Sequence, residues 1–324
     1  MGGSVPRWVR LALVVAALAL LALAGVSRWL LMPRLEALPL NGATTHARAS
    51  DGIVGDPTTG SQVRTDLTIT NRSRPVSVGS ARQFGNDVAV FDLATTGRGS
   101  DGRALFARHD RLAVDRRDRQ AAPCCPGQAG ATGGRAKHGY VLSFPPDVGK
   151  RNYPLWDPIL AKALPVQFAT TDSVNGLPTY VFVQNIPPTA VARDRVPARI
   201  VKAGLTGTAT VDRVYTVRRR IWVEPRTGTI VQRREQAETT LRAGGRTIMT
   251  VYAADSRYDA ATVRSQVALA GPWSRRLALT GDILPLVAGV LGLLALGIGL
   301  TARPSSDRPT TVSAVPAVPA GVRS

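Results

Sequence analysis

Two apolar segments without charges, one near each end of the chain, constrain its fold more than any other feature. They run from Leu11 to Ser27 and from Ile283 to Leu300. As a helix, the second segment would be about 27 Å long at a rise of about 1.5 Å per residue, close to a hydrocarbon core of about 30 Å. Arginines flank both segments, and Trp8 and Trp29 flank the first as interfacial aromatic residues do. We therefore expect two transmembrane helices.

Each segment has an alternative interpretation. The sequence Ala22-Leu23-Ala24 has the small-residue pattern of a signal-peptide cleavage site, so removal of the first segment is one alternative. The apolar run continues through Val26 and is followed by Arg28 and Trp29, which favours an uncleaved anchor. For the second segment, the alternative is a buried helix of a soluble core. Two anchors would put both ends of the chain on one side of the membrane.

The predicted organisation has six parts. They are a cytoplasmic N-terminus (1–10), a transmembrane helix (11–31), a stalk or loop (32–61), an extracytoplasmic β-rich domain (62–274), a second transmembrane helix (280–301) and a disordered cytoplasmic tail (302–324). Flanking arginines do not settle the orientation, because they occur on both sides of each span. We expect the middle part to be exported because an apolar segment so near the N-terminus is typical of an export signal.

The middle part predicts antiparallel β-structure. Residues 63–70 place apolar or methyl-bearing side chains at every second position, as a half-buried strand does. Asn175-Gly176 between two apolar runs is a strong signal for a hairpin turn. Three later arms, at 214–224, 229–241 and 247–252, are joined by short turns. Further strands are expected at 87–93, 105–114, 140–144, 165–171 and 177–186, and loop is expected at 41–61.

Two shorter patterns belong to the same domain. Asp259 is expected to cap a helix that reaches Ala270 and leads into the second span. The segment Gly97 to Gly102 matches the letters of a nucleotide-binding fingerprint, but a strand and not a helix is expected after it, so a hairpin loop is the better interpretation. The predicted fold class is therefore mainly β: an antiparallel β-rich extracytoplasmic domain between two transmembrane helices.

The chain is strongly basic, with a formal net charge of +19, and nearly all of this charge comes from arginine. Aromatic residues make up only 5% of the chain, and the arginines do not form a stripe interleaved with stacking rings. This pattern does not favour nucleic-acid binding and fits a basic surface that meets anionic lipid or polysaccharide. The arginines at 218–220 and 233–234 fit either a solvated sheet face or a basic ligand groove.

The sequence offers little for catalysis. The three histidines, His46, His109 and His138, lie in unrelated contexts, without the spacing of metal ligands. No nucleophile elbow, zinc-protease motif or phosphate-binding loop occurs in the sequence. We therefore expect a non-enzymatic protein without catalytic residues, metal or cofactor, and an enzyme acting on envelope polymers is the alternative.

The only two cysteines, Cys124 and Cys125, are adjacent in a Pro/Gly-rich loop. Outside the cytoplasm we expect them to be oxidised. Neighbouring Cα atoms lie about 3.8 Å apart, below the usual minimum of about 4.4 Å for a bridge, so a bond between them would be strained. A structural disulfide between these two residues is the preferred interpretation. Bridging to another chain and a reactive switch are the alternatives.

Several blocks of the sequence resemble an actinobacterial family described as porin PorA-like. They are Cys-Cys-Pro-Gly (Cys124 to Gly127), Tyr-Pro-Leu-Trp-Asp-Pro (Tyr153, Pro154, Leu155, Trp156, Asp157, Pro158), the hairpin turn Asn175-Gly176 with its following arm, and Trp-Val-Glu-Pro-Arg-Thr-Gly (Trp222, Val223, Glu224, Pro225, Arg226, Thr227, Gly228). The resemblance spans nearly the whole chain, including both anchors. It implies an envelope pore and brings no catalytic residues.

Two functions follow as expectations. The leading one is a membrane-anchored envelope protein of the cell membrane that binds or passes an envelope lipid or glycolipid, with membrane lipids or other envelope membrane proteins as partners. The other is a porin or channel component, as the family resemblance implies. A pore made by the strands of one chain is disfavoured, because arginines would face the lipid. Two lone apolar helices enclose no channel.

Overall fold

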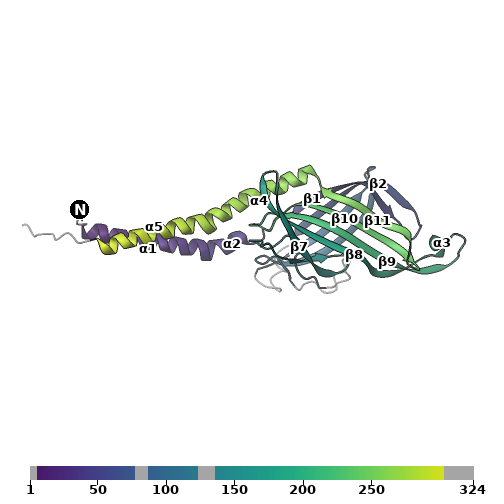
Figure 1. Cartoon of the computed structure of the whole chain (residues 1–324), viewed down its shortest axis with the longest axis horizontal. Helices are drawn as coiled ribbons and strands as arrows, with labels where there is room; N and C mark the ends of the chain where they lie inside the picture. Colours follow the sequence, from purple (N-terminus) through teal and green to yellow (C-terminus); the bar gives the residue numbers. More distant parts are fainter. Residues whose placement is uncertain (1–5, 77–86, 123–135, 303–324) are drawn as a thin grey trace, which may run out of the picture. The chain divides into compact units, whose positions relative to one another are not determined.

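The computed structural model describes residues 6–76, 87–122 and 136–302. The chain forms two compact units, drawn in Figure 1. The first, called here the helical unit, comprises Met1–Leu31 and Thr280–Ser324, and the second, the sheet domain, comprises Met32–Leu279. The predicted fold class, mainly antiparallel β with a long apolar helix at each end, is confirmed.

The helical unit is a pair of apolar helices. α1 (Arg7–Val26) is followed by a π-helical turn, η1 (Ser27–Leu31), and α5 (Leu284–Thr301) is preceded by another, η4 (Leu279–Ile283). The helical runs that contain them are long and apolar enough to cross a membrane. Their apolar side chains are largely exposed, as expected of helices that face lipid.

α1 and α5 pack against each other in opposite directions. Near the start of α1 and the end of α5, Arg10 Nε donates to the carbonyl of Gly299 at 3.1 Å. At the other ends, Ser27 Oγ donates to the carbonyl of Thr280 at 2.5 Å. A Cβ added at Gly292 would lie 3.0 Å from Leu21 Cγ, so this glycine lets the helices approach closely. The two helices therefore run antiparallel, and the side of a membrane on which the chain's ends lie remains a prediction.

Within the described residues, one sheet of eleven strands forms the body of the sheet domain. The strands are β1 (Ala43–Gly55), β2 (Gln62–Pro75), β3 (Val88–Arg98), β4 (Ala104–Asp115), β5 (Ala121–Ala122), β6 (Tyr153–Asp157), β7 (Lys162–Val174), β8 (Leu177–Pro197), β9 (Thr208–Val223), β10 (Ile230–Ala243) and β11 (Arg246–Tyr258). The order is β5-β4-β3-β2-β1-β11-β10-β9-β8-β7-β6, and all neighbours are antiparallel.

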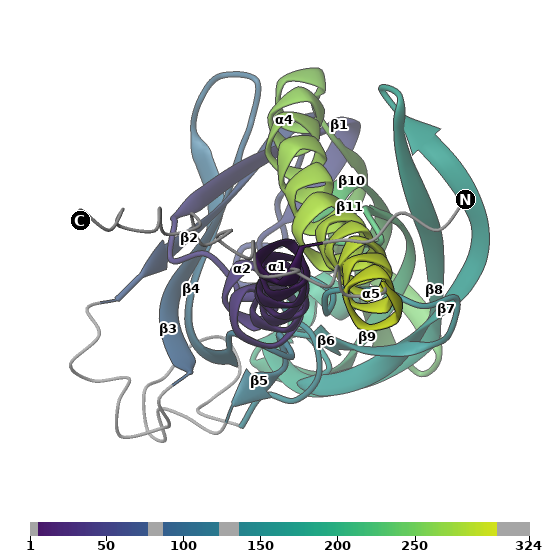
Figure 2. The same ribbon diagram turned by 90° about the vertical axis from the view of Figure 1, so that its left-hand side faces the viewer.

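The sheet curls until its two edges approach each other (Figure 2). The first and last long strands, β1 and β11, are neighbours in its middle, while β5 and β6 form its edges. Tyr140 bridges these edges, because it pairs with Gln120 beside β5 and with Leu155 of β6. The result is a curled, barrel-like sheet whose two edge strands are linked through Tyr140.

Alternation of side chains produces two different faces. Phe182, Ile221 and Val223 belong to one apolar cluster with the ring of Phe144, which stacks on Phe182 at 4.9 Å between centroids. Side chains at the neighbouring positions along each strand, such as Arg220 next to Ile221, point to the opposite face. We call the face that carries this apolar cluster the inner face, which is buried, and the opposite face the outer face, which is mostly exposed.

α4 (Ala260–Ala278) covers one end of the outer face. Asp259 caps it by accepting a hydrogen bond from Thr262 N at 2.8 Å, as predicted, and the helix continues through Pro272. Its Val263 and Ala270 pack in a cluster with Trp222 and Val181. This contact explains why the β8 segment around Val181 is apolar on both faces. Two short helices, α2 (Met32–Glu36) and α3 (Ala198–Val201), complete the domain.

Two local predictions were wrong. Residues 41–61 were expected to be loop, but β1 occupies Ala43–Gly55. Its small and polar residues gave little periodic signal, and pairing with β2 and β11 on its two sides fixes it as a strand. Residues 140–144 were expected to be a strand, but they make only the isolated bridge at Tyr140. There the hydrogen bond from Phe144 N goes to Gly228 of the β9–β10 turn.

Candidate functional site

An open groove of about 880 Å³ lies where β7 separates from β8. The two strands pair from their hairpin turn as far as Gln167 and Val183. Beyond this point residues 162–166 of β7 pair with β6, while β8 continues beside β9. The divergence of the two strands creates the groove.

The groove combines apolar and basic side chains. Its apolar lining comes from the β6–β7 turn, β7, β8 and β9: Leu160, Leu164, Pro165, Val183, Ile186, Pro187 and Trp222. Its basic lining comes from β7, β9 and β10: Lys162, Arg218, Arg219, Arg220 and Arg234. Of the two interpretations of the arginines at 218–220, the structure places them in the lining of this groove, and ligand binding there remains a prediction.

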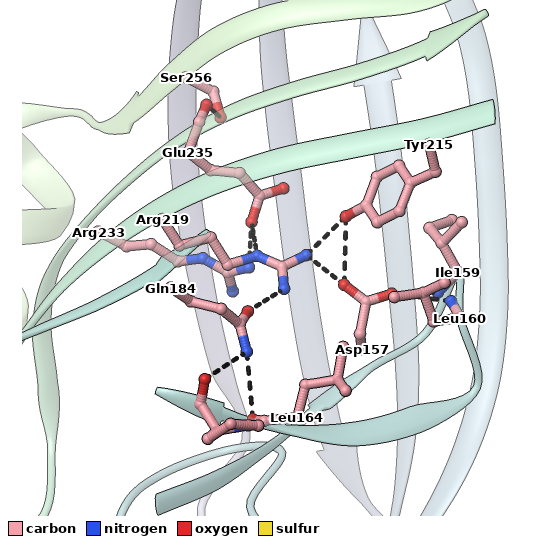
Figure 3. Close-up of polar contacts among 11 residues, drawn as sticks. Asp157, Ile159, Leu160, Leu164, Gln184, Tyr215, Arg219, Arg233, Glu235 and Ser256 are labelled. Carbon is pink, nitrogen blue, oxygen red and sulfur yellow. Dashed lines mark hydrogen bonds and ion pairs between the residues drawn. The ribbon is translucent and has the colours of Figure 1, made fainter. Parts of the chain in front are cut away.

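Arg219 lies at the base of the groove and is buried, with 3% of its side chain exposed. Its Nε donates to Glu235 at 2.6 Å and its Nη1 to Gln184 Oε1 at 2.7 Å. Its Nη2 donates to Asp157 at 2.7 Å and to the Tyr215 hydroxyl at 2.8 Å. Figure 3 shows these contacts converging on one guanidinium group. We call these five residues, with Arg233, the Arg219 network.

The Arg219 network joins strands where main-chain pairing has ended. Gln184 of β8 donates from Nε2 to the carbonyls of Leu164 and Pro165 in β7, at 3.1 and 3.3 Å. Asp157, at the end of β6, also accepts from Leu160 N at 2.9 Å. Side chains thus replace the missing ladder between β7 and β8. They hold the base of the groove in a fixed shape.

The charges of the network balance each other. Arg219 and Arg233 both bind Glu235, and Arg219 also binds Asp157. Burial alone would raise the pKa of Glu235, but the two guanidinium groups outweigh it and hold this pKa well below its ordinary value. Burial raises the pKa of Tyr215, so its hydroxyl remains protonated and donates to Asp157 at 3.2 Å.

The outer part of the groove is basic and open to solvent. Arg218 and Arg220 are exposed, and Arg234 forms an ion pair with Asp255. Trp222 donates from Nε1 to Asp172 at 2.8 Å, and Arg220 lies 5.9 Å from its ring centroid. An anionic head group could therefore meet guanidinium groups while an attached chain lies on the apolar lining.

Comparison with known proteins identifies the family. A family model described as porin PorA matches residues 9–301. The chain belongs to the porin PorA family. The resemblance noted in the sequence is thereby confirmed. No curated protein matches the chain.

The porin PorA block from Tyr153 to Pro158 forms β6 and the turn after it. Tyr153, Trp156 and Asp157 are buried, whereas Pro154 is exposed. Tyr153 packs against Phe144 and Phe182. Asp157 starts the turn by accepting hydrogen bonds from the backbone N–H groups of Ile159 and Leu160, and it is also a member of the Arg219 network.

The hairpin turn predicted at Asn175-Gly176 is confirmed, since it joins β7 to β8. Both residues have positive φ values, 49° and 79°, as a tight hairpin of this kind requires. The turn lies away from the groove lining. Its function in the fold is to set the register of β7 and β8.

The second porin PorA block, from Trp222 to Gly228, forms the end of β9 and its turn into β10. The Glu224 carboxylate accepts from Thr227 N at 2.7 Å and from Ser274 Oγ of α4 at 2.9 Å. Pro225 accepts from Val148 N through its carbonyl at 2.6 Å. Apart from Trp222, this block therefore fastens the sheet to α4 and to the preceding loop, and does not line the groove.

Cys124 and Cys125 lie outside the described residues, so the predicted disulfide and its alternatives remain predictions. The hairpin predicted at Gly97 to Gly102 agrees with the structure, because β3 ends at Arg98 and β4 begins at Ala104. Within the described ranges, no three His, Cys, Asp or Glu side chains form a group that could hold a metal ion.

Two members of the Arg219 network, Gln184 and Tyr215, were not singled out from the sequence. Arg219 was named only among the arginines of a solvated face or a groove, and its burial was not predicted. One signal could have found Arg219. In β9, Arg219 is separated by an even number of positions from the apolar Val217, Ile221 and Val223, which places all four side chains on the same, buried face of the strand. A charged residue at such a position needs partners of opposite charge from other strands.

Proposed function

We propose that this member of the porin PorA family is a non-enzymatic, membrane-anchored envelope protein that binds an anionic lipid or glycolipid in the groove between β7 and β8. The observation that carries the proposal is the composition of the groove, which places an apolar lining beside exposed arginines. Guanidinium groups bind phosphate and carboxylate in a bidentate manner. Each methylene of a ligand removed from water adds about 0.8 kcal/mol.

Lipid analysis of the full-length protein tests this function. The protein is purified in a mild detergent, and bound lipid is extracted and identified by mass spectrometry. We expect anionic lipid to co-purify with the wild type and to be reduced in R218E/R220E. The matched control is R193E/R195E, which changes two exposed arginines of β8 that are not in the groove lining. Equal lipid in all three proteins would contradict the proposal.

A channel is the second candidate, and the family match favours it, because the description of that family is porin. The two apolar helices would then contribute to a pore through assembly of several copies. Planar-bilayer recordings of the full-length protein test this candidate. Reproducible single-channel steps from protein that carries no bound lipid would favour the channel over lipid binding.

We also propose that the protein is a two-span protein of the cell membrane, with both ends cytoplasmic and the sheet domain outside. Support comes from the antiparallel pairing of α1 and α5 and from the length and apolar character of the helical runs that contain them. Reporter fusions after residue 302 decide the orientation. A reporter active only outside the cytoplasm would contradict it, and a mature protein beginning after Ala24 would show that the first segment is cleaved.

A further inference from the structure

The register of the sheet aligns arginines from strands that are far apart in the sequence. Arg234 of β10 lies opposite Arg220 of β9 on one side and Arg257 of β11 on the other. Arg257 lies opposite Arg48 of β1. The line then passes through Thr68 of β2 to Arg98 of β3. We call the five arginines the arginine row: Arg48, Arg98, Arg220, Arg234 and Arg257.

The row follows the curl of the sheet, is interrupted by Thr68 in β2, and is open to solvent. Direct cross-strand partners project to the same face of a sheet, and neighbouring strands lie about 4.8 Å apart, so six strands from β9 to β3 give a row of about 24 Å. All five arginines are exposed. The row runs across the outer face, perpendicular to the strands.

Acidic side chains neutralise only part of this charge. Asp255 binds Arg234 with distances of 2.9 and 2.5 Å and also acts on Arg257. Asp259 lies 3.8 Å from Arg48. Asp172 also acts on Arg220. Three carboxylates therefore act on the five guanidinium groups. Like charges directly opposite each other on neighbouring strands destabilise a sheet, so the direct pairing of arginine with arginine opposes folding.

We propose that the arginine row binds a linear polyanion, namely an acidic polysaccharide whose carboxylate or phosphate groups follow one another along the chain. A line of cations, four on adjacent strands and a fifth beyond Thr68, matches a line of anions, and each guanidinium group can bind one of them in a bidentate manner. A flat membrane surface would call for basic groups spread over a plane. Single-stranded nucleic acid would call for aromatic stacking platforms, and the row itself contains arginine and threonine only.

This proposal does not rest on lipid binding in the groove. Arg220 and Arg234 belong to both surfaces, but Arg48, Arg98 and Arg257 lie outside the groove lining. The triple variant R48Q/R98Q/R257Q therefore tests the row and leaves the groove unchanged. Its matched control is R193Q/R195Q/R246Q, which removes the same charge from three exposed arginines of β8 and β11 that are not in the row.

The experiment measures binding of fluorescently labelled polygalacturonate to full-length protein in neutral detergent, by anisotropy at several salt concentrations. Inorganic polyphosphate serves as a second probe and distinguishes phosphate from carboxylate. We expect the row variant to bind about tenfold more weakly or worse, and its plot of log affinity against log salt to be shallower by about two units, since each lost contact removes roughly 0.7 from the slope. The control should bind like the wild type.

Three results would overturn the proposal. The first is equal loss in the row variant and the control, which would mean that net charge alone attracts the probe. The second is wild-type binding by the row variant, provided that its circular dichroism is also that of the wild type. The third is stronger binding to phosphatidylglycerol vesicles or to a single-stranded oligonucleotide than to either polyanion, which would assign the row to another class of partner.

Discussion

Arg219 is the buried cation on which Asp157 depends, because the Asp157 side chain is fully buried and its ion pair is with Arg219. Replacing Arg219 with methionine keeps the volume and removes the charge. We expect a loss of about 3–5 kcal/mol in the free energy of unfolding, since an uncompensated buried carboxylate remains. Urea titration followed by tryptophan fluorescence measures it.

The exposed neighbour Arg218 provides the control for this prediction. Its replacement with methionine should change the free energy of unfolding by no more than about 0.5 kcal/mol. If both variants lose the same amount, the Arg219 network is not what stabilises the divergence of β7 and β8.

Glu235 makes stability depend on pH. Its pKa is lowered in the folded state, because the guanidinium groups of Arg219 and Arg233 outweigh the effect of burial. A depressed folded pKa gives stability that is present above the ordinary glutamate pKa of about 4.3 and is lost as pH falls below it. The wild type should therefore keep this contribution down to a pH of about 4 and lose it progressively as the pH falls further towards the much lower folded pKa.

The E235Q variant tests this assignment. It should be less stable than the wild type at pH 7, and the difference between the two proteins should shrink as the pH falls into the acidic range. Thermal unfolding measured across this range gives the comparison. A constant difference at every pH would show that another carboxylate is responsible.

Gly228 and Gly244 form a matched pair of glycines in the left-handed region, with φ values of 69° and 56°. A Cβ at Gly244 would meet nothing within 4 Å, whereas one at Gly228 would lie 2.2 Å from the Phe144 carbonyl oxygen. G244A should cost about 1–2 kcal/mol through backbone conformation alone. G228A should cost more, because the backbone of the preceding loop must move, and equal losses would contradict this reasoning.

At the scale of elements, the capping of α4 can be separated from its ion pair. Asp259 caps the helix through Thr262 N and also lies near Arg48. D259A should destabilise the sheet domain by about 1 kcal/mol, whereas D259N should be nearly neutral, because asparagine caps equally well. Chemical unfolding compares the two variants. A similar loss in both would assign the effect to the ion pair instead.

A second buried arginine, Arg119, contacts both α2 and α4 within the sheet domain. Arg119 is 1% exposed and donates to the carbonyl of Glu36, which ends α2. Its guanidinium group lies 5.4 Å from the ring centroid of Trp273 in α4. Burial lowers the pKa of Arg119 to about 10, so the group remains charged at neutral pH. The Arg119 side chain thus links α2 to α4.

At the scale of the whole molecule, the two units should unfold separately. The helical unit is apolar and held by detergent, whereas the sheet domain depends on buried strands and the Arg219 network. Urea should therefore remove the tryptophan signal of the sheet domain while helical ellipticity from α1 and α5 remains. Loss of both signals in one transition would mean that the units are coupled.

The amino-acid sequence by itself determined those features that depend on local pattern. Two apolar runs of helix length predicted α1 and α5, alternation predicted most strands, Asn175-Gly176 predicted a hairpin, and Asp259 predicted the start of α4. The weakly patterned β1 was missed, because its strand conformation comes from its neighbours. The blocks shared with the porin PorA family were also recognised in the sequence. Most of their residues form turns or pack in the core, and do not line the groove.

Only the tertiary structure decided which distant residues meet. The groove exists because β7 changes its pairing partner from β8 to β6. No local pattern of residues in β7 predicts that change. The arginine row depends on the pairing of β1 with β11, which brings residues 48 and 257 together across most of the chain. Register is a property of paired strands, so a sequence can show that an arginine lies in a strand but not which arginine lies opposite it.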